Sequence, residues 1–98
     1  MKVIHDSDDL RRLETDIKFD AGLERAIVKT FRMRMQLIRN ALDERAFYAM
    51  KSLHFEKLKG DRDGQYSMRL NSQWRLILKF QKEPSGKAVV VVAIADYH

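Results

Sequence analysis

The spacing of the hydrophobic residues changes near Leu58, and this change limits the possible fold more than any other feature of the sequence. Ahead of it an apolar residue recurs every three or four positions, which predicts a long amphipathic helix that opens near Asp20 with Glu24 close behind. The recurring residues are Leu23, Ile27, Phe31, Met35, Ile38 and Leu42. Beyond Leu58, apolar residues alternate with polar ones, as in strands with one buried face. Helices followed by strands predict an α+β domain with N-terminal helices packed on one face of a small antiparallel sheet.

Shorter elements precede and follow the long helix. Residues 2–5 are apolar and basic and form a possible first strand. Ser7, followed by two aspartates, is a typical N-cap and predicts a helix over about residues 8–18. Residues 43–52 are expected to pack as a further short helix or turn. No linker or repeat divides the sequence, so we expect a single domain over residues 1–98.

The second half predicts a hairpin and a returning strand. Tyr66, Met68 and Leu70 alternate with polar residues, and after a polar turn Trp74, Leu76, Leu78 and Phe80 alternate with Arg75, Ile77 and Lys79. The strand over residues 87–96 is apolar on both sides and is therefore expected to be central or to lie beneath the helices. If the apolar face meets the helices, Arg69, Arg75 and Lys79 share the open face.

The charge of the chain limits the classes of partner that it is expected to bind. The formal net charge is +5, of which +1 belongs to residues 1–50 and +4 to residues 51–98. A basic surface attracts polyanions such as nucleic acid, although acidic protein partners and plain solubility remain open as explanations. The long helix carries Arg25, Lys29, Arg32 and Arg39, either as a phosphate-binding stripe or, as we favour, as its solvated face.

Cysteine usage and hydropathy exclude several other classes. The chain has no cysteine, so it forms no disulfide and no cysteine-ligated zinc site. It has no signal-like start and no apolar run of membrane-spanning length, and we therefore expect a cytoplasmic protein that does not enter a membrane.

Three residues that can exchange protons follow the last predicted strand: Asp96, Tyr97 and His98. A buried strand that ends there would hold them in a fixed place, and histidine is a residue type suited to proton transfer near neutral pH. The plainer alternative is that Asp96 ends the strand, Tyr97 covers the edge of the core and His98 is solvated.

A glycine-containing basic loop suggests what those groups act on. The stretch Leu58-Lys59-Gly60-Asp61-Arg62-Asp63-Gly64 lets the backbone approach a ligand and supplies donors for an anion. Together with the later Trp74-Arg75 pair and the final Asp-Tyr-His, it resembles the HigB branch of the RelE-type bacterial toxins. The motif match covers residues 53–80 and 96–98, while the helical half is compatible in pattern.

The resemblance implies a ribosome-dependent mRNA endonuclease with a RelE-like fold. It also implies a cognate, HigA-like antitoxin, with the toxin monomeric alone and oligomeric in that complex. In such enzymes the ribose 2′-hydroxyl attacks the adjacent phosphate without a cofactor or a metal ion. This requires a proton acceptor, a proton donor and positive charge around the phosphorane.

The resemblance also assigns candidate residues. As catalytic groups it implies His98, Tyr97, Asp96, Arg75 and His54. As RNA-binding groups we add Lys57, Lys59, Arg62, Arg69, Gln73 and Lys79, of which Gln73 is placed to touch a base of the cleaved codon or is merely solvated. His54 departs from the family pattern, because three residues separate it from Leu58, and it reaches the site only if that segment bulges or turns.

Several alternatives stay open at this stage. The same scaffold serves toxins that inhibit DNA gyrase, and a basic RNA-binding module is a third possibility. Trp74 and Tyr66 can stack on bases, but their alternation favours packing in the core. A metal site built from His5, His54, His98 and Asp96 lacks ligands at short helical or hairpin spacing and is rejected.

Overall fold

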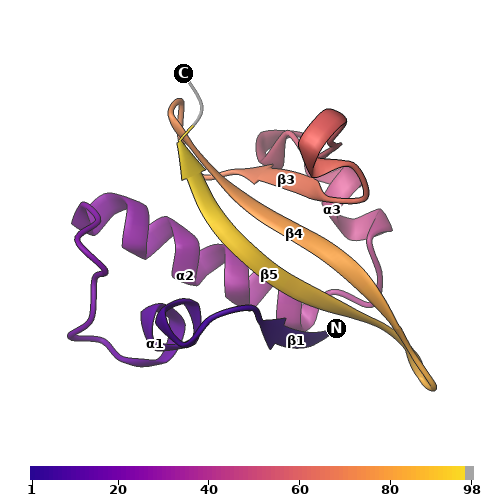
Figure 1. The fold of residues 1–98 in the computed structure, drawn as a ribbon, viewed down its shortest axis with the longest axis horizontal. Coiled ribbons are helices and arrows are strands. Elements are labelled where there is room, and N and C mark those ends of the chain that lie inside the picture. The colour runs from indigo at the N-terminus through magenta and orange to yellow at the C-terminus, as the bar shows by residue number, and fades with distance from the viewer. Residues whose placement is uncertain (97–98) are drawn as a thin grey trace.

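Helices lie on one side of a twisted sheet in the computed structural model of the chain, which describes residues 1–96 (Figure 1). The elements, in chain order, are β1 (Lys2–His5), α1 (Asp8–Thr15), α2 (Arg25–Asn40), α3 (Arg45–Ala49), η1 (Lys51–Leu53), β2 (Glu56–Lys57), η2 (Gly60–Arg62), β3 (Tyr66–Arg69), β4 (Trp74–Glu83) and β5 (Gly86–Asp96). The labels η1 and η2 denote short 3-10 helices. This is the predicted α+β architecture.

The sheet has the strand order β1-β5-β4-β3-β2 within the described residues. The β4–β5 hairpin is long and twisted, and it crosses in front of α2 in Figure 1. β5 is bordered by β4 and by β1, which confirms its predicted central place. β1 runs parallel to β5, however. The predicted antiparallel arrangement therefore holds for the other strand pairs and not for this one.

Helix α2 forms because its apolar residues share one face, which packs on the sheet. Phe31, Met35 and Ile38 are completely buried, and on the sheet they meet a layer that includes Leu76 and Val89. Leu42 was expected in this core but is 96% exposed, because α2 ends at Asn40 and the chain turns away.

Both predicted helices extended too far into the segment that connects α1 and α2. Ser7 caps α1 as expected, accepting a hydrogen bond from the backbone N–H of Leu10, but α1 ends at Thr15 and not near residue 18. The predicted start of α2 at Asp20 is also wrong. Asp20 accepts a hydrogen bond from the N–H of Gly22, in a turn where Ala21 and Gly22 have positive φ, a conformation that excludes a right-handed helix.

The two faces of the sheet differ as the alternation predicted. Trp74, Leu76, Leu78 and Phe80 pack on the helical side. Arg75 lies on the other face, directly opposite Arg69 in the β3–β4 register, and Lys79 follows on the same face of β4. Trp74 and Tyr66 contribute to the core, and Tyr66 stacks on Phe55 with a ring separation of 5.4 Å.

Candidate functional site

A left-handed turn at His54 places this side chain on the surface next to the sheet. Leu53, immediately before it, is fully buried, and Phe55, immediately after it, packs against Phe47 and Tyr48. His54 has φ 45° and ψ 48°, a left-handed conformation that few residues other than glycine adopt. The flanking apolar anchors fix this turn and leave the imidazole exposed. The segment therefore turns in the way that would bring His54 to the basic face.

Two arginines meet His54 at the end of β3 and the start of β4. Arg75 donates a hydrogen bond from Nη2 to the backbone carbonyl of His54 at 2.6 Å. Arg69 Nη1 lies 3.4 Å from Nε2 of the same residue. A guanidinium can only donate, so this contact is a hydrogen bond when Nε2 of His54 carries no proton. An imidazole and two guanidinium groups thus share one small area of the sheet.

Glu56 is the only carboxylate that the structure records beside these arginines within residues 1–96. Its Oε1 lies 3.6 Å from Nη2 of Arg75, and the Glu56 side chain is 58% exposed whereas that of Arg75 is 17% exposed. Glu56 is not among the predicted site residues, because the two-residue strand β2 that carries it is too short to leave a periodic signal in the sequence. The negative charge of Glu56 offsets the repulsion between the positive charges of Arg69 and Arg75, which face each other across β3 and β4.

Two buried polar atoms near the arginines lack a partner within the described part of the chain. They are Nε of Arg75 and Oγ of Ser67. Ser67 stands opposite both Glu56 and Ile77 in the strand registers, on the same face as Arg75. Unpaired buried polar groups are costly and tend to mark functional sites. The Nε–H of Arg75 is thus a buried donor without a hydrogen-bond acceptor among residues 1–96.

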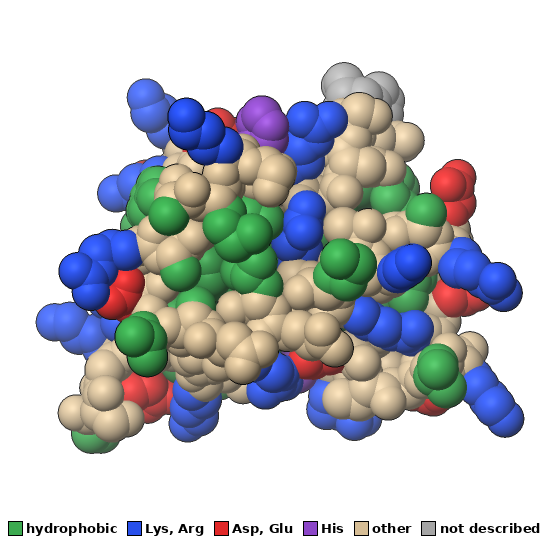
Figure 2. All heavy atoms as spheres, turned by 180° about the vertical axis from the view of Figure 1, so that it is seen from behind, with side chains coloured by type: hydrophobic (Ala, Val, Ile, Leu, Met, Phe, Trp, Pro, Cys, Tyr) green, Lys and Arg blue, Asp and Glu red, His purple; other side chains and the backbone are tan. Residues whose placement is uncertain are grey.

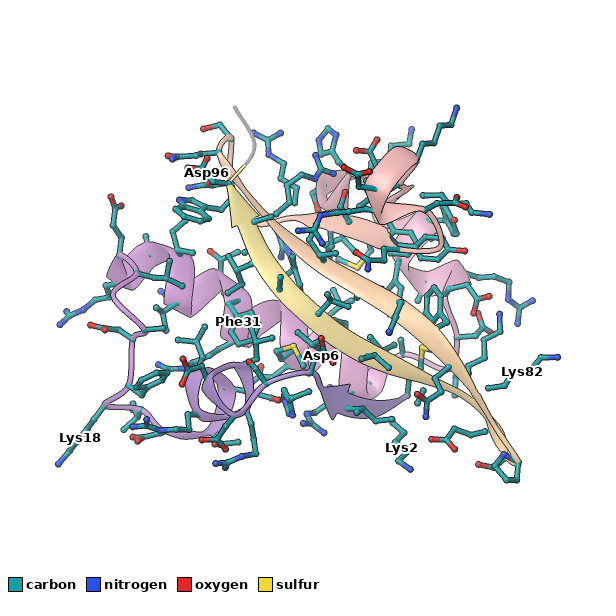
Figure 3. The ribbon with its side chains drawn as sticks, in the orientation of Figure 1. Lys2, Asp6, Lys18, Phe31, Lys82 and Asp96 are labelled. Carbon is teal, nitrogen blue, oxygen red and sulfur yellow. The ribbon has the colours of Figure 1, made fainter. Side chains whose placement is uncertain are left out.

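Asp96 and Gln73 form a second pair at the same end of the sheet. The amide nitrogen of Gln73 donates to Oδ2 of Asp96 at 3.1 Å. The turn that carries Gln73 is fixed by Asn71, whose side-chain oxygen accepts the backbone N–H groups of Gln73 and Trp74. Figure 3 labels Asp96 at the end of β5, and its neighbour Ala95 pairs with Arg75. The predicted residues Tyr97 and His98 lie outside the described residues.

The remaining predicted RNA-binding residues surround this area without joining it. Lys57 and Lys59 are exposed on β2 and the loop that follows it. Arg62 is held by a hydrogen bond from Nη1 to Oε1 of Gln65 at 3.0 Å. Lys79 is exposed on β4, about 13 Å from Arg75 at the rise of an extended strand. The sequence therefore found the basic face, and the structure brings His54, Arg69 and Arg75 together on it.

Neither a metal centre nor a membrane-spanning helix is found in the described part of the chain. No three His, Cys, Asp or Glu side chains among residues 1–96 are grouped so that they could hold a metal ion. None of the helices in this range is both long and apolar enough to cross a membrane.

Comparisons with known proteins give a consistent result. The family described as "RelE-like toxin of type II toxin-antitoxin system HigB" matches residues 4–98. No curated protein sequence matches the chain.

Solved structures share the fold at low sequence identity. A YoeB/ParE toxin from Agrobacterium tumefaciens has 21% identity and a TM-score of 0.63, with 100% of both chains covered. A YoeB-YefM complex from Staphylococcus aureus has 17% identity and a TM-score of 0.62, covering 100% of this chain and 97% of the other. YafQ from E. coli strain BL21(DE3) has 13% identity and a TM-score of 0.58, covering 97% and 91%.

Proposed function

Because the chain belongs to the HigB-like family of RelE-like toxins from type II toxin-antitoxin systems, we propose that it is an endoribonuclease that cleaves mRNA on the ribosome. Cleavage begins with attack of a ribose 2′-oxygen on the adjacent phosphorus, and the bond to the 5′-oxygen of the next nucleotide breaks. The products are a 2′,3′-cyclic phosphate, which can open to a 3′-phosphate, and a 5′-hydroxyl. The toxin thereby stops translation in the cytoplasm until its antitoxin neutralises it.

The observation that carries this proposal is the meeting of His54, Arg69 and Arg75 on one face. A phosphorane carries more negative charge than the phosphodiester from which it forms, so donors fixed beforehand stabilise it in preference to the substrate. Two guanidinium groups supply this charge, and we therefore propose a reaction that is independent of metal ions. Nε of Arg75 is buried without a partner among residues 1–96, Nη2 of the same side chain is fixed by the His54 carbonyl, and Arg69 lies beside the imidazole.

Proton transfer is assigned to groups around the arginines. The 2′-oxygen must lose a proton and the leaving 5′-oxygen must gain one. We propose that His54, Tyr97 and His98 provide these transfers, the last two on the strength of the Asp-Tyr-His match, with Asp96 held at the strand end by Gln73. Lys57, Lys59, Arg62 and Lys79 are proposed to bind the phosphates of neighbouring nucleotides, which positions the message without reading its sequence.

Glu56 is proposed to occupy Arg75 while no RNA is bound. Its carboxylate stands beside Nη2 of Arg75 and is largely exposed, so it can swing away when a phosphate arrives. An exposed ion pair contributes at most about 1 kcal/mol, which a phosphate with several contacts readily displaces. Glu56 then limits non-specific attraction of RNA to the site.

The test is inducible expression followed by mapping of mRNA 5′ ends on ribosomes. The wild-type protein is expected to arrest growth and to create new 5′ ends within translated codons. The matched variant is His54→Asn, because asparagine tolerates the left-handed conformation but does not transfer protons. We expect it to lose about a hundredfold or more of the cleavage. Growth arrest without new 5′ ends would instead indicate gyrase inhibition or passive binding.

A further inference from the structure

Strand β3 loses its neighbour β2 just before the candidate site. β2 is two residues long and pairs with β3 only as far as Ser67, which stands opposite Glu56. If the same register continued, His54 would stand opposite Arg69, but the left-handed turn at His54 ends the pairing. Arg69, the last residue of β3, therefore lies at a strand edge that β2 does not cover.

The backbone carbonyl of Arg69 points toward that uncovered edge. Leu70, the next residue, donates its backbone N–H to the carbonyl of Trp74 at 2.9 Å. Hydrogen-bonded and non-hydrogen-bonded pairs alternate along an antiparallel ladder, so the adjacent pair of Arg69 and Arg75 is of the second kind. The carbonyl of Arg69 thus points away from β4 and needs a donor from outside the sheet.

Arg34 of α2 supplies this donor from the helical side of the sheet. Its Nε donates to the carbonyl of Arg69 at 3.2 Å, which joins two residues that are 35 positions apart in the sequence. Arg34 follows the buried Phe31 by three residues and precedes the buried Ile38 by four, so it lies along the face of α2 that packs on the sheet. The end of β3 is therefore held by a side chain of the long helix.

A second arginine of the same helix makes contacts of this kind far from the site. Arg32 donates to the backbone carbonyls of three residues in and after α1, at 2.9, 2.9 and 3.2 Å: Leu13, Asp16 and Phe19. Arg32 is thus a structural clamp and not part of a solvated stripe, as the sequence had indicated. Arg34 differs from it because the residue that it holds, Arg69, belongs to the candidate site.

The charge of Arg34 has no counterion in the part of the chain that the structure describes. Its side chain is half-buried and forms no ion pair within residues 1–96. Burial lowers the pKa of this guanidinium from its usual value. Figure 2, which views the side opposite to that of Figure 1, shows Lys and Arg near the middle of this face, between hydrophobic side chains, and Asp and Glu toward its margins. Three guanidinium groups, those of Arg34, Arg69 and Arg75, thus gather around the end of β3, an arrangement that suits a bound anion.

We propose that Arg34 is a positioning residue for the cleavage reaction, an inference that rests on the proposed function. By holding the carbonyl of Arg69, it fixes the backbone from which the Arg69 side chain reaches His54 and the phosphate. A donor that stabilises a transition state must be held closely in place, because a misplacement of about 1 Å can cost about a hundredfold in rate. Arg34 itself touches neither the phosphate nor the reacting oxygens, and it acts through Arg69.

The experiment measures cleavage and local backbone protection in the full-length protein. The variants are Arg34→Ala and Arg34→Lys, the second of which keeps the charge and a donor but not the planar fork. The control is Arg25→Ala, the same substitution at an exposed position of α2 that forms no ion pair within residues 1–96. Single-turnover cleavage on ribosomes is recorded over a range of excess toxin concentrations. This gives the maximal rate and the half-saturating concentration, and NMR gives the hydrogen exchange rate of the Leu70 amide.

Arg34→Ala is expected to lower the maximal rate by about tenfold without changing the half-saturating concentration, and Arg34→Lys should lie between it and wild type. When Arg69 is already replaced by alanine, the further loss from Arg34→Ala should shrink to within about twofold, because an effect exerted through Arg69 disappears with that side chain. The Leu70 amide shares a peptide group with the Arg69 carbonyl, so it should exchange about tenfold faster in Arg34→Ala. The control should change none of these quantities.

A wild-type maximal rate in Arg34→Ala would overturn the inference, as would an equally large loss in the Arg69→Ala background. A rise in the half-saturating concentration alone would overturn it too, since Arg34 would then bind RNA. If the wild-type protein does not cleave mRNA, the proposed function fails, and the exchange rate of the Leu70 amide still decides whether Arg34 holds Arg69. Arg34→Lys carries the same comparisons if Arg34→Ala does not fold.

Discussion

Replacing Arg75 with alanine separates a role in catalysis from a role in folding. In the folded protein, Arg75 donates at 2.6 Å to the carbonyl of His54 and lies near Glu56. The exposed carbonyl can bind water once the guanidinium is gone, so the loss of stability is expected to be about 1 kcal/mol. In a domain of this size this corresponds to a fall in Tm of about 4–8 °C. Because whole domains are stable by about 5–15 kcal/mol, Arg75→Ala remains folded at the assay temperature.

The expected effect on the reaction is much larger. Removing one preorganised donor to a developing oxyanion costs about 10²–10³ in rate, and Arg69 remains to stabilise part of the charge. The assay is single-turnover cleavage on ribosomes at saturating toxin, with thermal unfolding recorded for the same samples. Arg75→Lys keeps the charge but not the planar fork, so its rate should lie between those of wild type and Arg75→Ala.

The pattern of results decides between the two roles. A large rate loss with a small Tm change supports direct action on the phosphate. An unchanged cleavage rate in Arg75→Ala would refute the assignment of this arginine to the transition state. A rate loss that disappears at lower temperature, where the variant is fully folded, would show that Arg75 acts through stability alone.

Three further predictions follow from other contacts. Glu56→Gln should bind RNA up to about fivefold more tightly in a filter-binding assay, because the pair with Arg75 contributes about 1 kcal/mol at most, and unchanged affinity would refute its role as a resident anion. Gln73→Ala should shift the codon preference seen in 5′-end maps while cleavage persists, and an identical map would remove Gln73 from base contact. The hydrogen bond from Arg39 lowers the pKa of Glu14, so this carboxylate stabilises the fold above its unfolded pKa and the stabilisation is lost as pH falls through the lower folded value. Denaturation curves of Glu14→Gln should therefore show a deficit of about 1 kcal/mol at pH 7 that shrinks below about pH 4, and a deficit independent of pH would contradict the ionic origin.

Much of the fold was predictable because hydrophobic periodicity reports directly on burial. The buried face of α2, the β3–β4–β5 arrangement and the basic open face all follow from periods of about 3.6 and 2 residues. The helix ends were predicted less well, because backbone turns fix them. A side chain such as Asp20 can cap either a helix or a turn, and only the positive φ of Ala21 and Gly22 decides between them here. The parallel pairing of β1 with β5 joins distant segments and has no local signal.

Most of the residues in the candidate site could be predicted from the sequence, but their arrangement in space could not. Alternation alone placed Arg69 and Arg75 on one face, and their register confirms it. The position of His54 depended on a left-handed turn between buried Leu53 and packed Phe55, which periodicity does not reveal. The two-residue strand β2 was too short to predict, and so the place of Glu56 beside Arg75 was missed. The roles of Tyr97 and His98 stay predictions.

The most direct test of the proposed reaction uses an mRNA with a single 2′-deoxyribose at the cleaved position. The unmodified message and the deoxy message are presented on purified ribosomes, and the rate of cleavage and the chemical ends of the products are measured. If the 2′-oxygen is the nucleophile, the unmodified message is cut to leave a 5′-hydroxyl, and the deoxy message stays intact at that position. Cleavage of the deoxy message at the same position and rate would contradict the proposed mechanism.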